Sequence, residues 1–90
     1  MAHTTRDREK LLNRVRRIRG QLEAVERALV EERDCGDVMQ LLAACRGAIG
    51  SLTGEVIEEH VRSHIGNPAG DSEKSRAVRE LIEILKTYIR

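Results

Sequence analysis

The sequence predicts an all-α protein, and three observations carry that prediction. Leu, Ile, Val and Ala supply most of the apolar residues, while Phe and Trp are absent and Tyr88 is the one aromatic residue. Apolar residues recur every three or four positions along two long stretches and a shorter third one. The one strong break lies at 66–70, which holds two glycines and Pro68. We therefore expect a single domain, 1–90, of three helices.

The first helix is expected to run from Thr4 or Thr5, either of which can cap it, to about Glu32. Its apolar residues are spaced four and three apart, as in a coiled-coil seam: Leu11, Val15, Ile18, Leu22, Val25 and Leu29. Gly20 lies inside this helix, and we expect the backbone of another segment to approach closely there.

The second helix is expected to begin between Cys35 and Asp37 and to reach about His64. It repeats the same spacing through Val38, Leu42, Cys45, Ile49, Leu52 and Val56. Three glycines lie within it: Gly47, Gly50 and Gly54. Glycine is a poor helix former, so we expect close helix packing to compensate at these positions.

The third helix is expected to start at a cap, Asp71 or Ser72. Its apolar face consists of Val78, Leu81, Leu85 and Ile89. The first two helices, joined by a tight connection, must lie antiparallel, and one such hairpin leaves an apolar seam uncovered. A chain of 90 residues buries little surface alone, so two hairpins are expected to pair as an antiparallel four-helix bundle.

Positive charge is concentrated at the amino-terminal end, although the net charge of the chain is only +1. Seven basic residues in 1–20 stand against Asp7 and Glu9, giving this segment a charge of about +5. The seven are Arg6, Arg8, Lys10, Arg14, Arg16, Arg17 and Arg19. The cluster indicates either contact with a polyanion or a solvated helix face, and charge alone does not choose between them.

The chain lacks a membrane-spanning stretch, and its beginning lacks the apolar core of a signal peptide, so we expect a cytoplasmic protein with no membrane partner. In that compartment Cys35 and Cys45 are expected to be reduced. Cys45 occupies a seam position and is best interpreted as a buried small apolar residue.

A metal site is indicated by two histidines one helical turn apart. His60 and His64 can bind one ion from the same face, and the antiparallel hairpin brings His3 to the same end. Cys35, at the start of a helix whose dipole stabilises anions, is the natural thiolate ligand. It lies about 37 Å along the helix from His60, so the two can share an ion only across a dimer interface.

An enzyme is not expected. The sequence contains no nucleophile with a partner base, no phosphate-binding loop and no carboxylate pair in an apolar setting, and hence no site for a small-molecule substrate. Glu58 and Glu59 precede His60 and are interpreted as surface charges. The less favoured alternative is that they contact a histidine ligand.

Taken together, these residues resemble the CsoR/RcnR/FrmR group of small bacterial metal-sensing repressors. Three segments carry the resemblance in order and spacing: RVRRIRGQLEAVERAL (14–29), LLAACRGAI (41–49) and EVIEEHVRSHI (55–65). The resemblance implies a homodimeric bundle, completed by the third helix into a disc-shaped homotetramer. It further implies that basic faces of the apo tetramer bind operator DNA and that the effector releases it.

The ligand positions are most similar to those of the RcnR branch, which responds to nickel and cobalt. The resemblance implies a site of His3, Cys35, His60 and His64, with the amine of Ala2 joining once Met1 is removed. Nitrogen-rich ligation with one thiolate suits Ni(II) or Co(II), although Zn(II) and Cu(I) stay possible. For the DNA we expect Arg14 and Arg17 to contact phosphates, assisted by Arg6, Arg8, Lys10, Arg16 and Arg19.

Two alternatives stay open. A formaldehyde- or copper-responsive repressor would share the scaffold, but the copper branch carries Cys at the position of His64 and the formaldehyde branch carries Pro at that of Ala2. A helical interaction module with a structural zinc site would not bind DNA at all.

Overall fold

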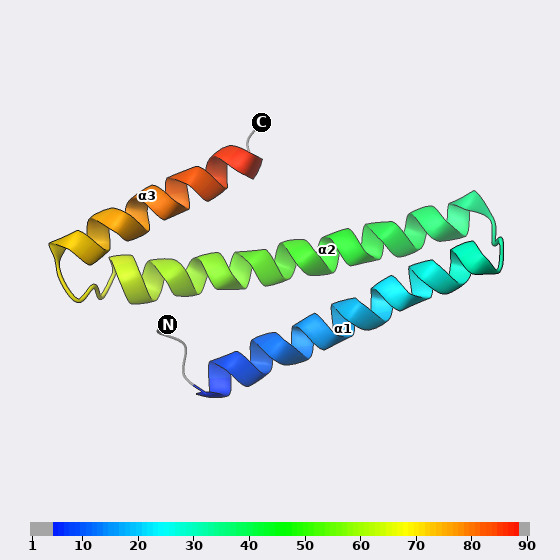
Figure 1. Ribbon diagram of the computed structural model, residues 1–90, viewed down its shortest axis with the longest axis horizontal. Helices are drawn as coiled ribbons and strands as arrows, with labels where there is room; N and C mark the ends of the chain where they lie inside the picture. The colour runs from blue at the N-terminus through cyan, green and yellow to red at the C-terminus, as the bar shows by residue number, and fades with distance from the viewer. Residues whose placement is uncertain (1–4, 89–90) are drawn as a thin grey trace. The chain divides into compact units, whose positions relative to one another are not determined.

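The computed structural model describes the backbone of residues 5–88 and the side chains of residues 7–88. Three α-helices follow in order, α1 (Thr5–Val30), α2 (Cys35–His60) and α3 (Asp71–Tyr88), with a π-helical turn, η1 (Val61–Ile65), directly after α2 (Figure 1). No strand occurs in the described part of the chain. The predicted all-α fold is confirmed, although α1 ends two residues before the expected Glu32. None of the helices within 5–88 is long and apolar enough to span a membrane.

Residues 5–53 and 54–88 pack as two separate units, and α2 runs from the first into the second. In the first unit α1 and the early part of α2 form a helical hairpin (Figure 1). Its most buried residues are apolar or small: Ile18, Val25, Ala28 and Cys45. Cys45 is 3% exposed, which confirms that it packs as a small apolar residue.

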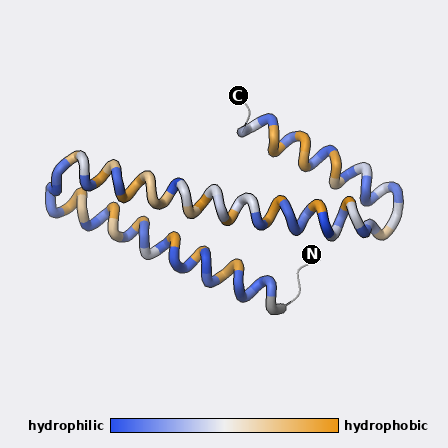
Figure 2. Tube along the Cα trace, turned by 180° about the vertical axis from the view of Figure 1, so that it is seen from behind, coloured by the Kyte–Doolittle hydropathy of each residue, from blue (hydrophilic) through white to orange (hydrophobic). Residues whose placement is uncertain are grey.

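The predicted seam of α1 is divided between two faces. Ile18 and Val25 are buried inside the hairpin, whereas other members of the same pattern are exposed: Val15 (43%), Leu22 (49%) and Leu29 (61%). These three follow one another at seven-residue intervals, so they form one apolar row along the helix. On α2 a further set stays uncovered, Met39, Leu42, Ile49 and Val56. Figure 2 shows apolar positions along both helices among hydrophilic ones.

The glycines expected to mark close helix packing do not do so within the hairpin. Apart from the nearby backbone of its own helix, a Cβ atom added at Gly20, Gly47, Gly50 or Gly54 would meet nothing within 4 Å. The expectation of close approach is therefore wrong for the described part of a single chain. The helices accommodate these glycines without a compensating contact from the same hairpin.

The turn between α1 and α2 closes the first helix with a Schellman motif. The amide of Arg33 donates to the carbonyl of Ala28 (2.9 Å), and the amide of Glu32 donates to that of Leu29 (3.2 Å). Glu32 takes the left-handed conformation that this motif needs, with φ of 54°. It is the one non-glycine residue with positive φ among those described, and glycine is the usual occupant of that position.

In the second unit, η1 and a short loop lead into α3, whose contact side is centred on Ala77, 2% exposed. Gly70 directly precedes α3, and Asp71 is already its first helical residue. The expected cap at Asp71 or Ser72 is therefore wrong. The side chain of Glu73 instead reaches back, and its Oε2 accepts from the amide of Ala69 at 2.6 Å. A side chain of the first turn thus satisfies a backbone donor ahead of the helix.

We expect Glu32→Gly to raise the free energy of unfolding by about 1 kcal/mol, because glycine adopts the left-handed conformation without a Cβ clash. Urea denaturation at fixed protein concentration measures the change. Glu31→Gly is the matched control, because it places the same residue type one position earlier and should not stabilise the protein. Equal effects of the two variants would contradict this account of the turn.

Candidate metal centre

The two predicted histidine ligands come together in the second unit, at the change from α to π geometry. His60 is the last residue of α2, and His64 lies within η1. Their ring centroids are 5.3 Å apart, with 49° between the ring planes. The π turn is closed by the amide of Gly66, which donates to the carbonyl of Val61 at 2.7 Å. Such turns occur often at functional sites, because the added residue changes where side chains point.

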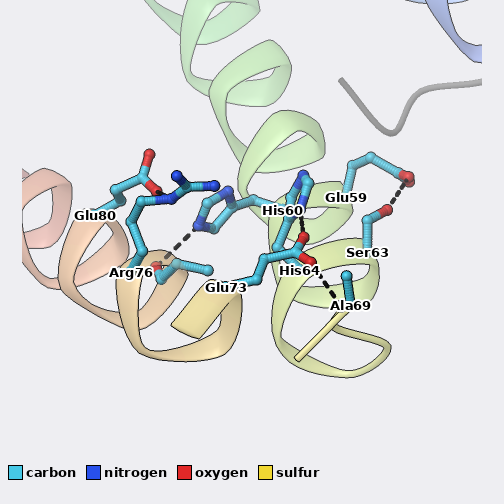
Figure 3. A network of polar contacts seen from close by, with 9 residues as sticks. Glu59, His60, Ser63, His64, Ala69, Glu73, Arg76 and Glu80 are labelled. Atoms are coloured by element: carbon cyan, nitrogen blue, oxygen red, sulfur yellow. Dashed lines mark hydrogen bonds and ion pairs between the residues drawn. The ribbon is translucent and has the colours of Figure 1, made fainter. Parts of the chain in front are cut away.

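A backbone carbonyl of α3 orients His60. Its Nε2 lies 2.9 Å from the carbonyl oxygen of Ala77, in a part-buried setting (Figure 3). A carbonyl oxygen can only accept a hydrogen bond, so this geometry requires the proton on Nε2. In the neutral ring the lone pair is then on Nδ1, the nitrogen free to bind an ion.

A carboxylate of α3 orients His64 through Nδ1, whereas His60 is held through Nε2. Nδ1 of His64 lies 2.6 Å from Oε1 of Glu73. The hydrogen bond from His64, together with that from the amide of Ala69, lowers the pKa of Glu73 below its ordinary 4.5. Glu73 is therefore a carboxylate at neutral pH and accepts from an Nδ1–H group, which leaves the lone pair of neutral His64 on Nε2.

Both imidazoles thus carry the kind of support that metal-binding histidines have in proteins. Such a ring commonly donates its second N–H to a carboxylate or a backbone carbonyl, which fixes its tautomer and orientation. The rings border a hollow of about 180 Å³ whose remaining lining comes from α3, namely Glu73, Arg76, Ala77 and Glu80. Figure 3 shows these side chains gathered around the two rings. The two imidazoles are suited to a metal ion that binds nitrogen ligands.

The described part of one chain does not complete a metal site. No group of three or more His, Cys, Asp or Glu side chains within it is placed to hold an ion. Cys35 is exposed and reduced at the first residue of α2, while His60 is at the last. His3 and the amine of Ala2 lie outside the described residues. Among the predicted ligands that the structure describes, it thus brings together His60 and His64 but not Cys35.

The acidic residues beside His60 bond to neighbouring side chains of the same helical end. Glu58 and Glu59 both pair with Arg62, and Oε1 of Glu59 accepts from the hydroxyl of Ser63 at 2.7 Å. The carboxylate that supports a histidine comes instead from Glu73, which sequence reasoning missed. Its signal was present, because the short connection after His64 must place the first turn of α3 beside the histidine pair.

The basic residues of α1 divide into different faces. Lys10, Arg14 and Arg17 are spaced four and three apart and share one face. Nη2 of Arg14 donates to Oγ of Ser51 on α2 at 2.5 Å, a partner that the sequence did not reveal. Arg16 bonds to Asn13 (2.9 Å) and lies 4.0 Å from Glu9. Arg8 and Arg19 are exposed elsewhere on the helix, and the side chain of Arg6 lies outside those described.

Beside that face is a hollow of about 190 Å³, bounded by Arg14, Arg17, Ile18, Gln21 and Ala48. Oε1 of Gln21, one of these residues, is buried without a hydrogen-bond partner. The hollow is thus bordered by two arginines of the basic face, which give it positive charge.

The fold and the site define a class of protein. It is small and all-helical, and it carries a pair of oriented imidazoles and a basic helix face. Residues 7–87 match the family described as metal-sensitive transcriptional repressor. The transcriptional repressor RcnR of Salmonella paratyphi B is 36% identical over 90 residues, covering 100% of both chains. The chain belongs to this family of metal-sensitive transcriptional repressors, which are regulators of transcription and not enzymes.

Two solved structures extend the comparison. A variant of the formaldehyde-responsive regulator FrmR from Salmonella enterica serovar Typhimurium superposes with a TM-score of 0.87 at 36% identity, over 97% of this chain and 99% of that one. The nickel-responsive transcriptional regulator InrS superposes with a TM-score of 0.75 at 28% identity, over 99% of this chain and 100% of that one. The fold is thus shared by regulators with different effectors.

Proposed function

We propose that this protein is a nickel- or cobalt-responsive repressor, which binds operator DNA without metal and releases it when Ni(II) or Co(II) binds, so that metal efflux genes are expressed. The observation that carries the proposal is the pair of imidazoles at the end of α2, each with one nitrogen held by α3 and the other left for an ion. The same arrangement would serve no purpose for a regulator that uses only the thiol of Cys35.

The metal site is completed by a second copy of the chain. Cys35 is separated from His60 by the whole length of α2, so its thiolate joins the histidine pair of a partner subunit. The exposed apolar row of Val15, Leu22 and Leu29 supports this, because a monomer would leave it in water. Pairing buries that row in an antiparallel four-helix bundle, and two such dimers form the homotetramer.

The ligand set favours nickel or cobalt over copper. His3, His60 and His64 supply imidazoles, the amine of Ala2 adds a further nitrogen, and Cys35 supplies one thiolate. Cu(I) prefers several sulfur ligands, whereas a nitrogen-rich set suits borderline divalent ions; Zn(II) would need only four of these ligands. The similarity to the nickel-responsive InrS supports the same choice.

Operator DNA is bound by the face of α1 that carries Lys10, Arg14 and Arg17. Arg14, which donates to Ser51, and Arg17 both border the adjoining hollow, where phosphate oxygens would meet their guanidinium groups. The other basic residues predicted for this role, on different faces, contribute through the general positive field. Sequence preference then depends mainly on DNA shape.

Release follows from the position of His3 in the chain. This ligand precedes α1, so holding it at the histidine pair ties the amino-terminal segment to the metal site and rearranges the basic face behind it. A coupling of about 1 to 3 kcal/mol per site is typical of allosteric proteins, and several sites in one tetramer add up to a switch. The protein acts as one domain in the cytoplasm, without a membrane partner or a small-molecule substrate.

Formaldehyde response is the second candidate, and the similarity to the FrmR variant at 36% identity favours it. Exposed Cys35 would be the reactive group in that case. The two proposals differ in what the histidines do, because formaldehyde chemistry at a thiol does not require a metal-binding pair.

Titration with Ni(II) or Co(II) is expected to produce a thiolate-to-metal charge-transfer band and to release operator DNA in a gel-shift assay. Cys35→Ser should remove the band, because no other exposed thiol is available. Cys45→Ala is the matched control and should keep it, because Cys45 is buried. Release by formaldehyde or Cu(I), with none by Ni(II) or Co(II), would contradict the assignment.

Arg17→Ala is expected to weaken operator binding and to make the slope of log K against log salt shallower by about 0.9 for each phosphate that the variant no longer neutralises. Fluorescence anisotropy across a salt series measures both. Arg27→Ala removes the same charge from the far end of α1 and should change neither quantity strongly. If the two variants behave alike, the basic face does not bind the DNA.

A further inference from the structure

Glu73 makes two hydrogen bonds that join separate parts of the second unit. Its Oε1 accepts from Nδ1 of His64, and its Oε2 accepts from the amide of Ala69, both at 2.6 Å (Figure 3). The carboxylate is 23% exposed, and the His64 side chain is 31% exposed. One side chain therefore connects the histidine in η1, the loop at 66–70 and the first turn of α3.

The choice of ring nitrogen depends on this carboxylate. A neutral imidazole carries its proton on either nitrogen, and the partner of one nitrogen decides which. A carboxylate oxygen accepts the hydrogen bond, so the contact of 2.6 Å between Oε1 of Glu73 and Nδ1 of His64 places the ring proton on Nδ1 and the lone pair on Nε2. Among the described residues, Glu73 is the hydrogen-bond partner of His64, so the choice of tautomer depends on Glu73.

We propose that Glu73 is a positioning residue for the metal site, which holds Nε2 of His64 ready for the ion and ties that ligand to the start of α3. This inference rests on the proposed function. It assigns to α3 a part in metal sensing, because an ion bound at His64 strengthens a connection that also closes the loop before this helix. The ordering of the loop and the first turn of α3 then depends on metal occupancy.

The variant Glu73→Gln distinguishes a role of Glu73 in positioning His64 from a role in filling space. Glutamine has nearly the same shape but offers one acceptor oxygen and one NH₂ donor. With its oxygen on the amide of Ala69, its NH₂ group faces Nδ1 of His64, which must then accept. The proton moves to Nε2, and the nitrogen meant for the ion is blocked until the ring changes its tautomer.

The experiment uses the full-length protein with ¹⁵N-labelled histidine, at a pH where ordinary imidazoles are neutral. In the metal-free wild type, NMR should show His64 as the Nδ1–H tautomer, and in Glu73→Gln the Nε2–H form should increase. The affinity for Ni(II) should fall about 10- to 100-fold in the variant, the usual effect of removing a partner of a metal-binding histidine. Amide exchange at Ala69 should slow on Ni(II) binding in the wild type but not in Glu73→Gln.

Glu83→Gln is the matched control, because Glu83 lies on the same helix, is 73% exposed and forms an ion pair with nearby Lys86. It should leave tautomer, affinity and exchange unchanged. Glu73→Gln with an unchanged tautomer or unchanged affinity overturns the role of Glu73 and leaves the proposed function intact. A wild type that binds neither Ni(II) nor Co(II) overturns the proposed function as well, whatever its tautomer.

Discussion

The length of α2 is the constraint on which the rest of the structure depends. This one helix of 26 residues begins at a thiol, Cys35, and ends at an imidazole, His60. At a rise of 1.5 Å per residue the two ends are about 37 Å apart, so the sulfur and the nitrogen of one chain cannot bind the same ion. The proposed site, in which Cys35 and His60 share an ion, therefore requires two copies of the chain and would couple metal binding to the geometry of the oligomer.

At the end of α2, two of the proposed ligands are already oriented within one chain. The carbonyl of Ala77 orients the ring of His60 through Nε2, and Glu73 orients the ring of His64 through Nδ1. Fixing the rings in advance lowers the conformational entropy that ligation would otherwise cost. Both partners belong to α3, so the proposed metal site depends on this helix, which also packs within its own unit.

Much of this could be predicted from the sequence, because helical periodicity and the glycines and proline after Ile65 are local signals. Three helices, a buried Cys45 and the pairing of His60 with His64 all follow from them. The π turn, left-handed Glu32 and the division of the α1 seam do not, because each depends on which side of a helix another element covers. Glu73 was missed although the short connection after His64 pointed to it, because its partner lies nine residues away across a turn.

The most direct test of the central claim mixes two defective subunits, Cys35→Ser and the double variant His60→Ala/His64→Ala. Each alone should lack the thiolate-to-Ni(II) charge-transfer band. After subunits exchange, each mixed pair holds one intact site, with Cys35 from one chain and both histidines from the other, so the band should reappear. A mixture that forms mixed oligomers but stays without the band would contradict a site shared between subunits.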